Sequence, residues 1–376
     1  MIDRRLIQNF DWVLFLIACS LTLIGITTIY SATITITFKN GTLASQPYYM
    51  KQMIWMGIGI ISLFLVLIID YRKLGRYSYF IYGISLFLLI LVLFVGKSGM
   101  GAQRWFSLGP VSFQPSEITK IFLIISLAWF LSKEQSGPMR LRDLILPAFF
   151  FLFLPLFLVL KQPDLGTALM ILFIFTSMVI MAGIRWRSLL ILILPALLTS
   201  PFWVKLFWNS LKDYQKARLL VFLNQDVDPL GVGYHISQSK IAIGSGKIFG
   251  KGYLAGTQGQ LRFLPERHTD FIFSIFAEEW GFLASLLLLA VYVMLIFWGI
   301  GIANKAKDRL GALIAIGVVS MISVYLIVNV GMTLGLMPVV GLPLPFLSYG
   351  GTSIVAAFMA IGILMNVRMR RFMLFY

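Results

Sequence analysis

The chain alternates long apolar runs with short polar segments. A run of about 18 or more apolar residues is long enough to cross the hydrocarbon core of a bilayer as a helix. About ten such runs can be marked, with boundaries good to about three residues. They cover residues 12–31, 52–70, 77–95, 117–132, 144–161, 166–184, 188–206, 270–302, 310–335 and 353–368. The pattern predicts an all-α, polytopic membrane protein, organised as a single transmembrane domain over residues 1–376.

Composition agrees with this fold class and excludes several others. Hydrophobic residues make up 59% of the chain and charged residues 12%, too apolar a balance for a soluble domain of this length. Cys19 is the only cysteine, and His235 and His268 are the only histidines. A disulfide framework and a Cys/His metal cluster are therefore excluded. The apolar run after Arg4 and Arg5 is long enough to span, which predicts an uncleaved first helix and not a signal peptide.

The positive charge is distributed unevenly between the two faces of the predicted bundle. With the N-terminus inside, the inner segments contain Arg4, Arg5, Arg72, Lys73, Arg76, Lys133, Arg140, Arg142, Arg185, Arg187, Lys305, Lys307, Arg309, Arg368, Arg370 and Arg371. The short outer loops contain Lys39, Lys51, Lys97, Arg104 and Lys161. This asymmetry follows the positive-inside rule and predicts that both termini are cytoplasmic. The net charge of +16 then requires no nucleic-acid partner.

One long extracytoplasmic loop, about residues 207–269, is predicted between the seventh and eighth spans. Amphipathic stretches in it, such as 236–243, are expected to lie on the outer membrane surface. The loop also contains Gly244-Ser245-Gly246-Lys247. The Gly-x4-Gly-Lys-Ser/Thr spacing of a nucleotide-binding loop does not occur there, and this face sees no cytosolic nucleotide, so that function is excluded.

Four acids lie where an outer loop meets or enters an apolar run. Ionisable groups are costly at membrane depth and are usually kept there for function. Glu117 follows Gln114-Pro115-Ser116, Asp164 follows Gln162-Pro163, and Asp270 and Glu278 belong to the eighth span. For Glu117 and Asp164, a plain role as capping acids after a proline at a helix start is an equally good interpretation.

Asp270 is the strongest candidate for a functional acid. Thr269 can cap the eighth helix, so Asp270 is not needed for capping. On a helix, Asp270, Ser274 and Glu278 would share one face at i, i+4 and i+8. Glu279 would point about 180° away from Asp270 and is expected to pair elsewhere in the bundle.

Basic side chains on the outer side stand opposite these acids. They are Arg104, Lys120, Lys240, Arg262 and Arg267. Transfer of a group from a pyrophosphate needs a carboxylate base flanked by cations, which stabilise the charge on the departing phosphate. Two plainer interpretations stay open. The cations could contact anionic lipid headgroups, and Lys120 could form an i,i+3 ion pair with Glu117.

Several motifs resemble one family. They are Gly101-Ala102-Gln103-Arg104-Trp105, Gln114-Pro115-Ser116-Glu117, Gln162-Pro163-Asp164-Leu165-Gly166-Thr167, Gly233-Tyr234-His235 through Gly246, Leu264 through Trp280, and Pro343-Leu344-Pro345-Phe346-Leu347-Ser348-Tyr349-Gly350-Gly351. In this order they resemble the SEDS proteins (shape, elongation, division, sporulation) over essentially the whole chain. The wording of residues 264–270 and the short termini are closer to the elongation branch than to the division branch. Lys247 departs from the pattern, because elongation members commonly have a glycine there.

The resemblance implies a ten-helix fold and a peptidoglycan glycosyltransferase. Such an enzyme polymerises lipid II at the outer face of the bacterial cytoplasmic (inner) membrane during elongation, beside a class B penicillin-binding protein that supplies transpeptidation. The family's catalytic acid corresponds to Asp270, which would deprotonate the acceptor's 4-hydroxyl. That oxygen attacks the donor's anomeric carbon with inversion, and undecaprenyl pyrophosphate leaves. The residues expected to bind substrate are Arg104, Glu117, Lys120, Asp164, Lys240 and Glu278. A divalent cation (Mg²⁺ or Mn²⁺) at the pyrophosphate stays open, because no ligand set for it can be read from the sequence.

Two other functions remain as alternatives. A lipid II flippase would also have many spans with acids and prolines, but it needs polar groups through the full membrane thickness. Here the outer acids cluster at one depth. A non-catalytic scaffold for wall synthases would bind its partners and tolerate the loss of Asp270.

Overall fold

The computed structural model describes most of the chain. The described residues are 9–36, 43–45, 48–99, 102–108, 111–133, 138–185, 188, 190–191, 205, 208–209, 211, 213–223, 231–261, 263–264 and 266–371. Within them, 9 helices or helical segments are long and apolar enough to cross a membrane. They coincide with nine of the ten predicted spans, which confirms the polytopic helical class. The predicted span 188–206 lies almost entirely outside the described residues.

The helices of the described part of the chain follow one another in sequence order. Their bounds are α2 (Trp12–Thr33), α3 (Tyr48–Ile68), α4 (Tyr71–Val95), α5 (Pro115–Lys133), α6 (Leu141–Ala148), η1 (Phe149–Phe153), α7 (Leu154–Lys161), α8 (Leu165–Gly183), α11 (Asp213–Leu223), α12 (Val232–Ser245), α13 (Thr257–Gln260), α14 (Ile272–Asn304), α15 (Arg309–Thr333) and α16 (Gly351–Met369). The segments α6, η1 and α7 form one span of 21 residues. Pro147 and Pro155 lie on either side of its π-helical turn, where proline removes ladder hydrogen bonds and loosens the helix.

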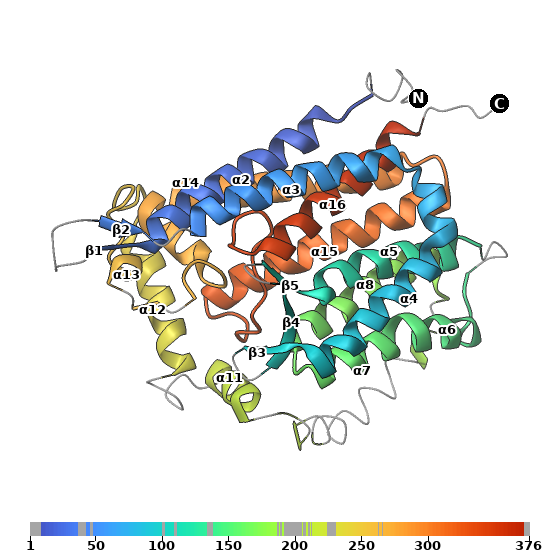
Figure 1. Cartoon of the computed structure of the whole chain (residues 1–376), viewed down its shortest axis with the longest axis horizontal. Helices are drawn as coiled ribbons and strands as arrows, with labels where there is room; N and C mark the ends of the chain where they lie inside the picture. The colour runs from blue at the N-terminus through green and yellow to red at the C-terminus, as the bar shows by residue number, and fades with distance from the viewer. Residues whose placement is uncertain are drawn as a thin grey trace.

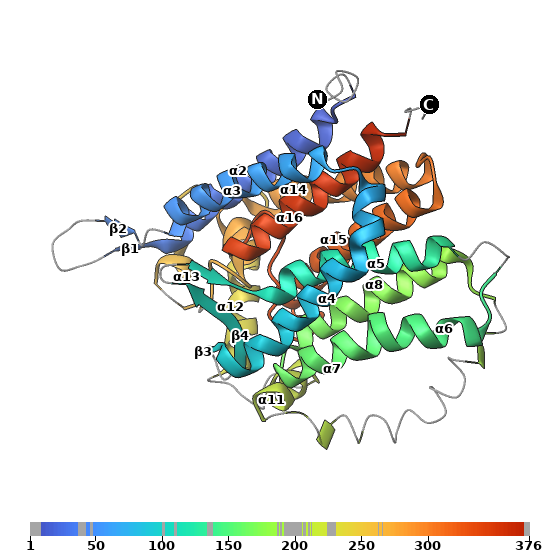
Figure 2. The same ribbon diagram turned by 45° about the vertical axis from the view of Figure 1, so that its right-hand side comes forward.

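Two small antiparallel sheets belong to the connections and were not predicted. Strand β1 (Ile34–Ile36) pairs with β2 (Leu43–Ser45). Strand β4 (Ala102–Leu108) pairs with β3 (Lys97–Gly99) and β5 (Val111–Phe113), with Phe106 opposite Phe113. In Figures 1 and 2 both sheets lie at the same end of the bundle as α12 and α13.

The start of α2 and the end of α16 lie together at the opposite end of the bundle (Figure 1). This placement agrees with two termini on one side of the membrane. The assignment of that side to the cytoplasm rests on the charge distribution and stays a prediction.

Helices α5, α15 and α16 form the interior, and most of their residues are buried. The outer helices α3, α4 and α14 expose large apolar side chains, as expected of surfaces that face lipid. Between α3 and α16, glycines bring the two backbones close. A Cβ at Gly59 would lie 2.6 Å from the Phe358 ring, and one at Gly362 would lie 3.0 Å from the Leu63 carbonyl oxygen. Such close helix contacts are made by small residues in membrane bundles.

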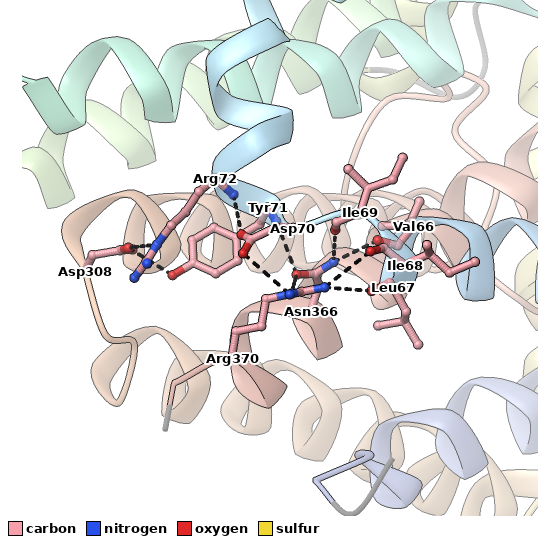
Figure 3. Close-up of polar contacts among 10 residues, drawn as sticks. All are labelled: Val66, Leu67, Ile68, Ile69, Asp70, Tyr71, Arg72, Asp308, Asn366 and Arg370. Carbon is pink, nitrogen blue, oxygen red and sulfur yellow. Dashed lines mark hydrogen bonds and ion pairs between the residues drawn. The ribbon is translucent and has the colours of Figure 1, made fainter. Parts of the chain in front are cut away.

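A polar clamp at the end near the termini closes the corner between α3 and α4 (Figure 3). Asn366 Nδ2 donates to the carbonyls of Val66 and Ile69 at 2.7 and 2.6 Å. Arg370 donates to the carbonyl of Leu67 at 3.1 Å and lies 3.4 Å from a carboxylate oxygen of Asp70. The last turn of a helix leaves its carbonyl groups without intrahelical donors. Asn366 and Arg370 supply donors to the carbonyls at the end of α3.

The α3–α16 contact yields a stability prediction. Gly59→Leu should lower the unfolding temperature, because the new side chain must displace the Phe358 ring and overpacking typically costs about 1–3 kcal/mol. The measurement is thermal unfolding of the purified protein in detergent. Gly57→Leu is the matched control on the same helix, since a Cβ at Gly57 has nothing within 4 Å. Equal unfolding temperatures for the two variants would contradict this account of the packing.

Candidate active site

Asp270 lies in a turn directly before α14, which begins at Ile272 with Phe271 as its N-cap residue. The hydroxyl of Thr269 donates to the carbonyl and the carboxylate of Glu266, at 3.2 and 3.1 Å. Two expectations were therefore wrong. Thr269 does not cap α14, and Asp270 is not part of the helix, so it does not share a helical face with Ser274.

Two distant segments fix the backbone of this turn. Asn329 of α15 donates its amide to the carbonyls of Asp270 and Leu342, at 3.0 and 2.8 Å. The Ser348 hydroxyl donates to the Thr269 carbonyl at 2.7 Å, and the Tyr349 amide donates to the His268 carbonyl at 2.8 Å. The acid is thus held in place before any ligand binds, which is what a catalytic group requires.

The carboxylate of Asp270 and the guanidinium of Arg218 of α11 both lie close to Gly341. A Cβ at Gly341 would lie 3.6 Å from Asp270 Oδ2 and 3.9 Å from Arg218 Nη1. Gly341 has a φ of +75°, a conformation that costs glycine little. This position therefore lets the backbone pass close to both charged groups.

The environment of Asp270 raises its pKa to about 6. Desolvation by the surrounding protein is the largest cause, and the negative charge of Glu266 adds to it. The positive charges of Arg218 and Arg104 act in the opposite direction and lower the pKa. A carboxylate with a pKa near the working pH is suited to accept a proton.

Arg104 of β4 is held next to Asp164. Its Nε donates to the Gln162 carbonyl at 3.1 Å, and its Nη2 donates to the Pro163 carbonyl. Its Nη1 lies 3.8 Å from Asp164 Oδ1. Asp164 also accepts hydrogen bonds from the amide and hydroxyl of Thr167, at 3.1 and 2.9 Å. The capping interpretation of Asp164 is therefore confirmed, and the same carboxylate orients Arg104.

Glu117 and Lys120 form the buried i,i+3 ion pair that was one of the two interpretations. Lys120 Nζ lies 2.7 Å from Glu117 Oε1. The Tyr325 hydroxyl of α15 contacts both carboxylate oxygens, at 3.1 and 3.0 Å, and also contacts Lys120. This triad joins α5 to α15 in the interior of the bundle.

Glu278 lies on α14, shortly before a break in that helix. Its carboxylate accepts from Lys251 Nζ at 2.6 Å and from the Thr257 amide at 2.8 Å. Glu278 was expected on the same face as Asp270, and the structure instead places it against residues 251–258. Glu279 accepts a hydrogen bond from the Ser31 hydroxyl of α2, so its expected pairing elsewhere in the bundle is confirmed.

The break itself occurs at Gly281, with φ +76° and ψ −172°. The interrupted ladder is completed by residues 247–252. The amides of Lys251 and Gly252 donate to the carbonyls of Glu278 and Glu279, at 3.1 and 3.0 Å. The amides of Phe282 and Leu283 donate to the carbonyls of Lys247 and Ile248, at 2.9 and 3.2 Å.

Lys247 belongs to this inserted loop and has a φ of +50°. A left-handed backbone favours glycine. This explains in physical terms why the sequence pattern has a glycine at the position where this chain has lysine.

Lys240 lies on α12, away from these pairs. The helix is anchored by Ser239, whose hydroxyl lies 2.7 Å from the Ser274 hydroxyl and 2.7 Å from the Thr333 carbonyl. Lys240 itself is exposed, and its Nζ would lie 2.9 Å from a Cβ at Gly335. Of the two other outer cations, Arg267 donates to the Gly259 carbonyl, and Arg262 lies outside the described residues.

Three residues that build the site were missed in the sequence. Asn329 and Tyr325 carry a detectable signal, because they are polar residues four positions apart inside an apolar run and so share a helical face. Arg218 carries none, since only the folded position of α11 brings it to Asp270. Within the described part of the chain, no group of three His, Cys, Asp or Glu residues could hold a metal ion.

Comparison with known proteins identifies the family. The model of the cell cycle protein family of FtsW, RodA and SpoVE matches residues 11–372. The chain belongs to this family. An Escherichia coli K12 relative named peptidoglycan glycosyltransferase MrdB is 41% identical over 319 residues, which are 85% of each chain. The family resemblance seen in the motifs is thereby confirmed.

Solved structures of family members share the fold. The crystal structure of the rod shape determining protein RodA of Thermus thermophilus matches with a TM-score of 0.70 and 31% identity, over 97% of this chain and 98% of that one. A chain from a peptidoglycan synthase complex, studied for the coordination of polymerization and crosslinking, matches with a TM-score of 0.80 and 34% identity, over 96% and 98%.

The raised pKa of Asp270 predicts a stability cost at neutral pH. Its folded pKa of about 6 exceeds the ordinary 3.8, so the folded state binds the proton more tightly and stability falls as pH rises from about 4 to 6. Asp270→Asn removes this cost. At pH 7.5 it should stabilise the fold by about 1–3 kcal/mol, discounted because the carboxylate is partly exposed.

The measurement is thermal unfolding of Asp270→Asn and wild type between pH 4 and 8. The gain should vanish at the acidic end. Asp143→Asn, at the other end of the bundle, should change the unfolding temperature little at any pH. A variant of Asp270 that is never more stable than wild type would contradict the desolvated site.

Proposed function

We propose that this protein is a peptidoglycan glycosyltransferase that polymerises lipid II into glycan strands at the outer face of the bacterial cytoplasmic membrane. Family membership supports the reaction class, because relatives carry that name. The observation that carries the proposal is the desolvated carboxylate of Asp270, fixed at one end of the bundle beside Arg218 and Arg104.

Asp270 acts as the general base. Its carboxylate takes the proton from the 4-hydroxyl of the acceptor sugar, and that oxygen forms a bond to the anomeric carbon of the donor. The bond between this carbon and the pyrophosphate oxygen breaks, and its electron pair leaves with undecaprenyl pyrophosphate. Because the α-linked donor becomes a β-linked product, the displacement inverts the anomeric carbon and needs no covalent sugar–enzyme intermediate.

The cations around Asp270 receive the charge that develops on the leaving group. Guanidinium groups suit phosphate oxygens, because their donors lie in one plane and can bind two oxygens at once. Arg104 is oriented by carbonyls and by Asp164, so it can meet the pyrophosphate without reorganising. Lys240, exposed on α12, is the further cation that this proposal assigns to the pyrophosphate.

The other residues predicted for the site hold its helices and loops in position. Glu117 and Lys120 hold α5 against α15 through Tyr325. Glu278 holds the loop of residues 251–258 against α14. We assign these residues to shaping the site, and Arg104, Lys240 and Asp270 to contact with substrate.

The partner in this proposal is a class B penicillin-binding protein. The polymer made at Asp270 needs crosslinking, which this chain does not supply in the proposed mechanism. The similarity to a chain of a peptidoglycan synthase complex supports such an assembly. The similarity to the rod shape determining protein RodA supports the elongation role that we propose.

Asp270→Ala and Asp270→Asn should abolish polymerisation of lipid II, with a loss of at least about 100-fold, the usual contribution of a general base. The measurement is glycan length on gels, with purified protein alone and with its penicillin-binding partner. Asp143→Asn is the control for handling and folding. Near-normal polymer from the Asp270 variants would reject the assignment. Translocation of lipid II across liposome membranes without polymerisation would favour the flippase. Normal growth of cells that depend on Asp270→Ala would favour the scaffold.

The acid limb of the pH–rate profile should report the ionisation of Asp270. The base must be deprotonated, so the rate rises with pH through about 6. Arg218→Gln removes a charge that lowers this pKa, and the limb should move to higher pH. Glu266→Gln removes a charge that raises it, and the limb should move to lower pH. Shifts in the same direction for both variants would show that another group controls the limb.

A further inference from the structure

A pocket lies far from Asp270, at the end of the bundle where α2 begins and α16 ends. Its volume is about 450 Å³. The lining combines aromatic and other apolar side chains with three cations. It includes Met294, Phe297, Trp298, Gly301, Lys305, Arg368 and Arg371.

One of the cations is held rigidly at the pocket wall. Arg368 forms an ion pair with the buried carboxylate of Asp11. The same carboxylate accepts a hydrogen bond from Trp298 Nε1 at 3.0 Å. The guanidinium lies over the Trp298 ring, 4.9 Å from its centroid. Asp11 is only 3% exposed, and its carboxylate fixes Arg368 in place. Arg368 is therefore an ordered part of the pocket wall.

The charges around the pocket do not cancel. Lys305, Arg368 and Arg371 bring three positive charges to the lining, and Asp11 brings one negative charge behind it. Among the described residues of the lining there is no carboxylate. Taken together, these groups leave the pocket electropositive.

The apolar part of the pocket continues along α14, away from the cations. Met294 and Phe297 belong to the lining and are 47% and 68% exposed. Met294 and Lys305 are eleven residues apart, which is about 16 Å along a helix. The pocket therefore has a cationic mouth and an apolar wall that runs to membrane depth.

We infer that this pocket binds one anionic phospholipid of the cytoplasmic leaflet. Its phosphate lies among Lys305, Arg368 and Arg371, and an acyl chain follows Phe297 toward the membrane interior. Basic pockets between membrane helices on the cytoplasmic side suit such headgroups. A free anion would leave the apolar wall unused, and a partner helix would have to bury three cations in contact with apolar residues. The inference is independent of the chemistry proposed at Asp270.

The first test removes charge. Purified protein is titrated with phosphatidylglycerol, and bound lipid is counted by native mass spectrometry. Lys305→Gln with Arg371→Gln should weaken binding by about 10-fold or more. Lys73→Gln with Arg76→Gln is the matched control, because it removes equal charge from exposed positions of α4 on the same predicted face. Equal weakening by both pairs would reduce the effect to general surface charge and overturn the site.

The second test fills the pocket and leaves every charge in place. A Cβ at Gly301 has nothing within 4 Å, so the side chain of Gly301→Leu enters the pocket without a clash and improves helix propensity. The variant should unfold no earlier than wild type and lose about as much phosphatidylglycerol as the charge variant. Wild-type binding by Gly301→Leu would overturn the proposal. So would equal binding of phosphatidylcholine, or competition by inorganic phosphate at the same concentration.

Discussion

The carbonyl groups of residues 268–270 are the constraint around which the outer end of the bundle is arranged. They lie before the first turn of α14, so no helix supplies them with donors, and buried carbonyls need partners. Asn329, Ser348 and Tyr349 provide those donors. Helix α15 and the segment before α16 are thereby drawn to one point, and the carboxylate of Asp270 is fixed by groups that never touch its side chain.

Acidic and basic side chains both surround this point, and they are paired to different degrees. Arg104 is hydrogen-bonded to carbonyls and lies next to Asp164, while Arg218 and Asp270 both lie close to Gly341. A fully paired carboxylate would have a low pKa and would be a poor base, and an isolated one would stay protonated. The mixture of Glu266 and the two arginines lets desolvation dominate and sets an intermediate affinity for the proton.

The membrane spans could be predicted because length and hydropathy are local properties of the chain. The predicted span 77–95 starts too late in the sequence, because Asp70 caps α4 and the helix already begins at Tyr71. The site was predicted less completely. Asp270 could be selected as an acid at a span boundary, but the presence of Arg218 near it depends on where α11 packs. Glu278 was misplaced because Asp270 lies before the first turn of α14, and because helical spacing cannot reveal that the inserted loop covers Glu278.

That insertion gives α14 a mechanical property that a continuous helix lacks. The four backbone groups left without helical partners at Gly281 are all engaged by residues 247–252, so the change of direction leaves none of them unpaired. A sharp change of direction in a helix normally carries the cost of such unpaired groups. The loop of residues 247–252 is therefore hydrogen-bonded to both parts of α14 and joins the stretch from Ile272 to Trp280 to the lipid-facing remainder, so displacing the loop would release the two parts of the helix from each other.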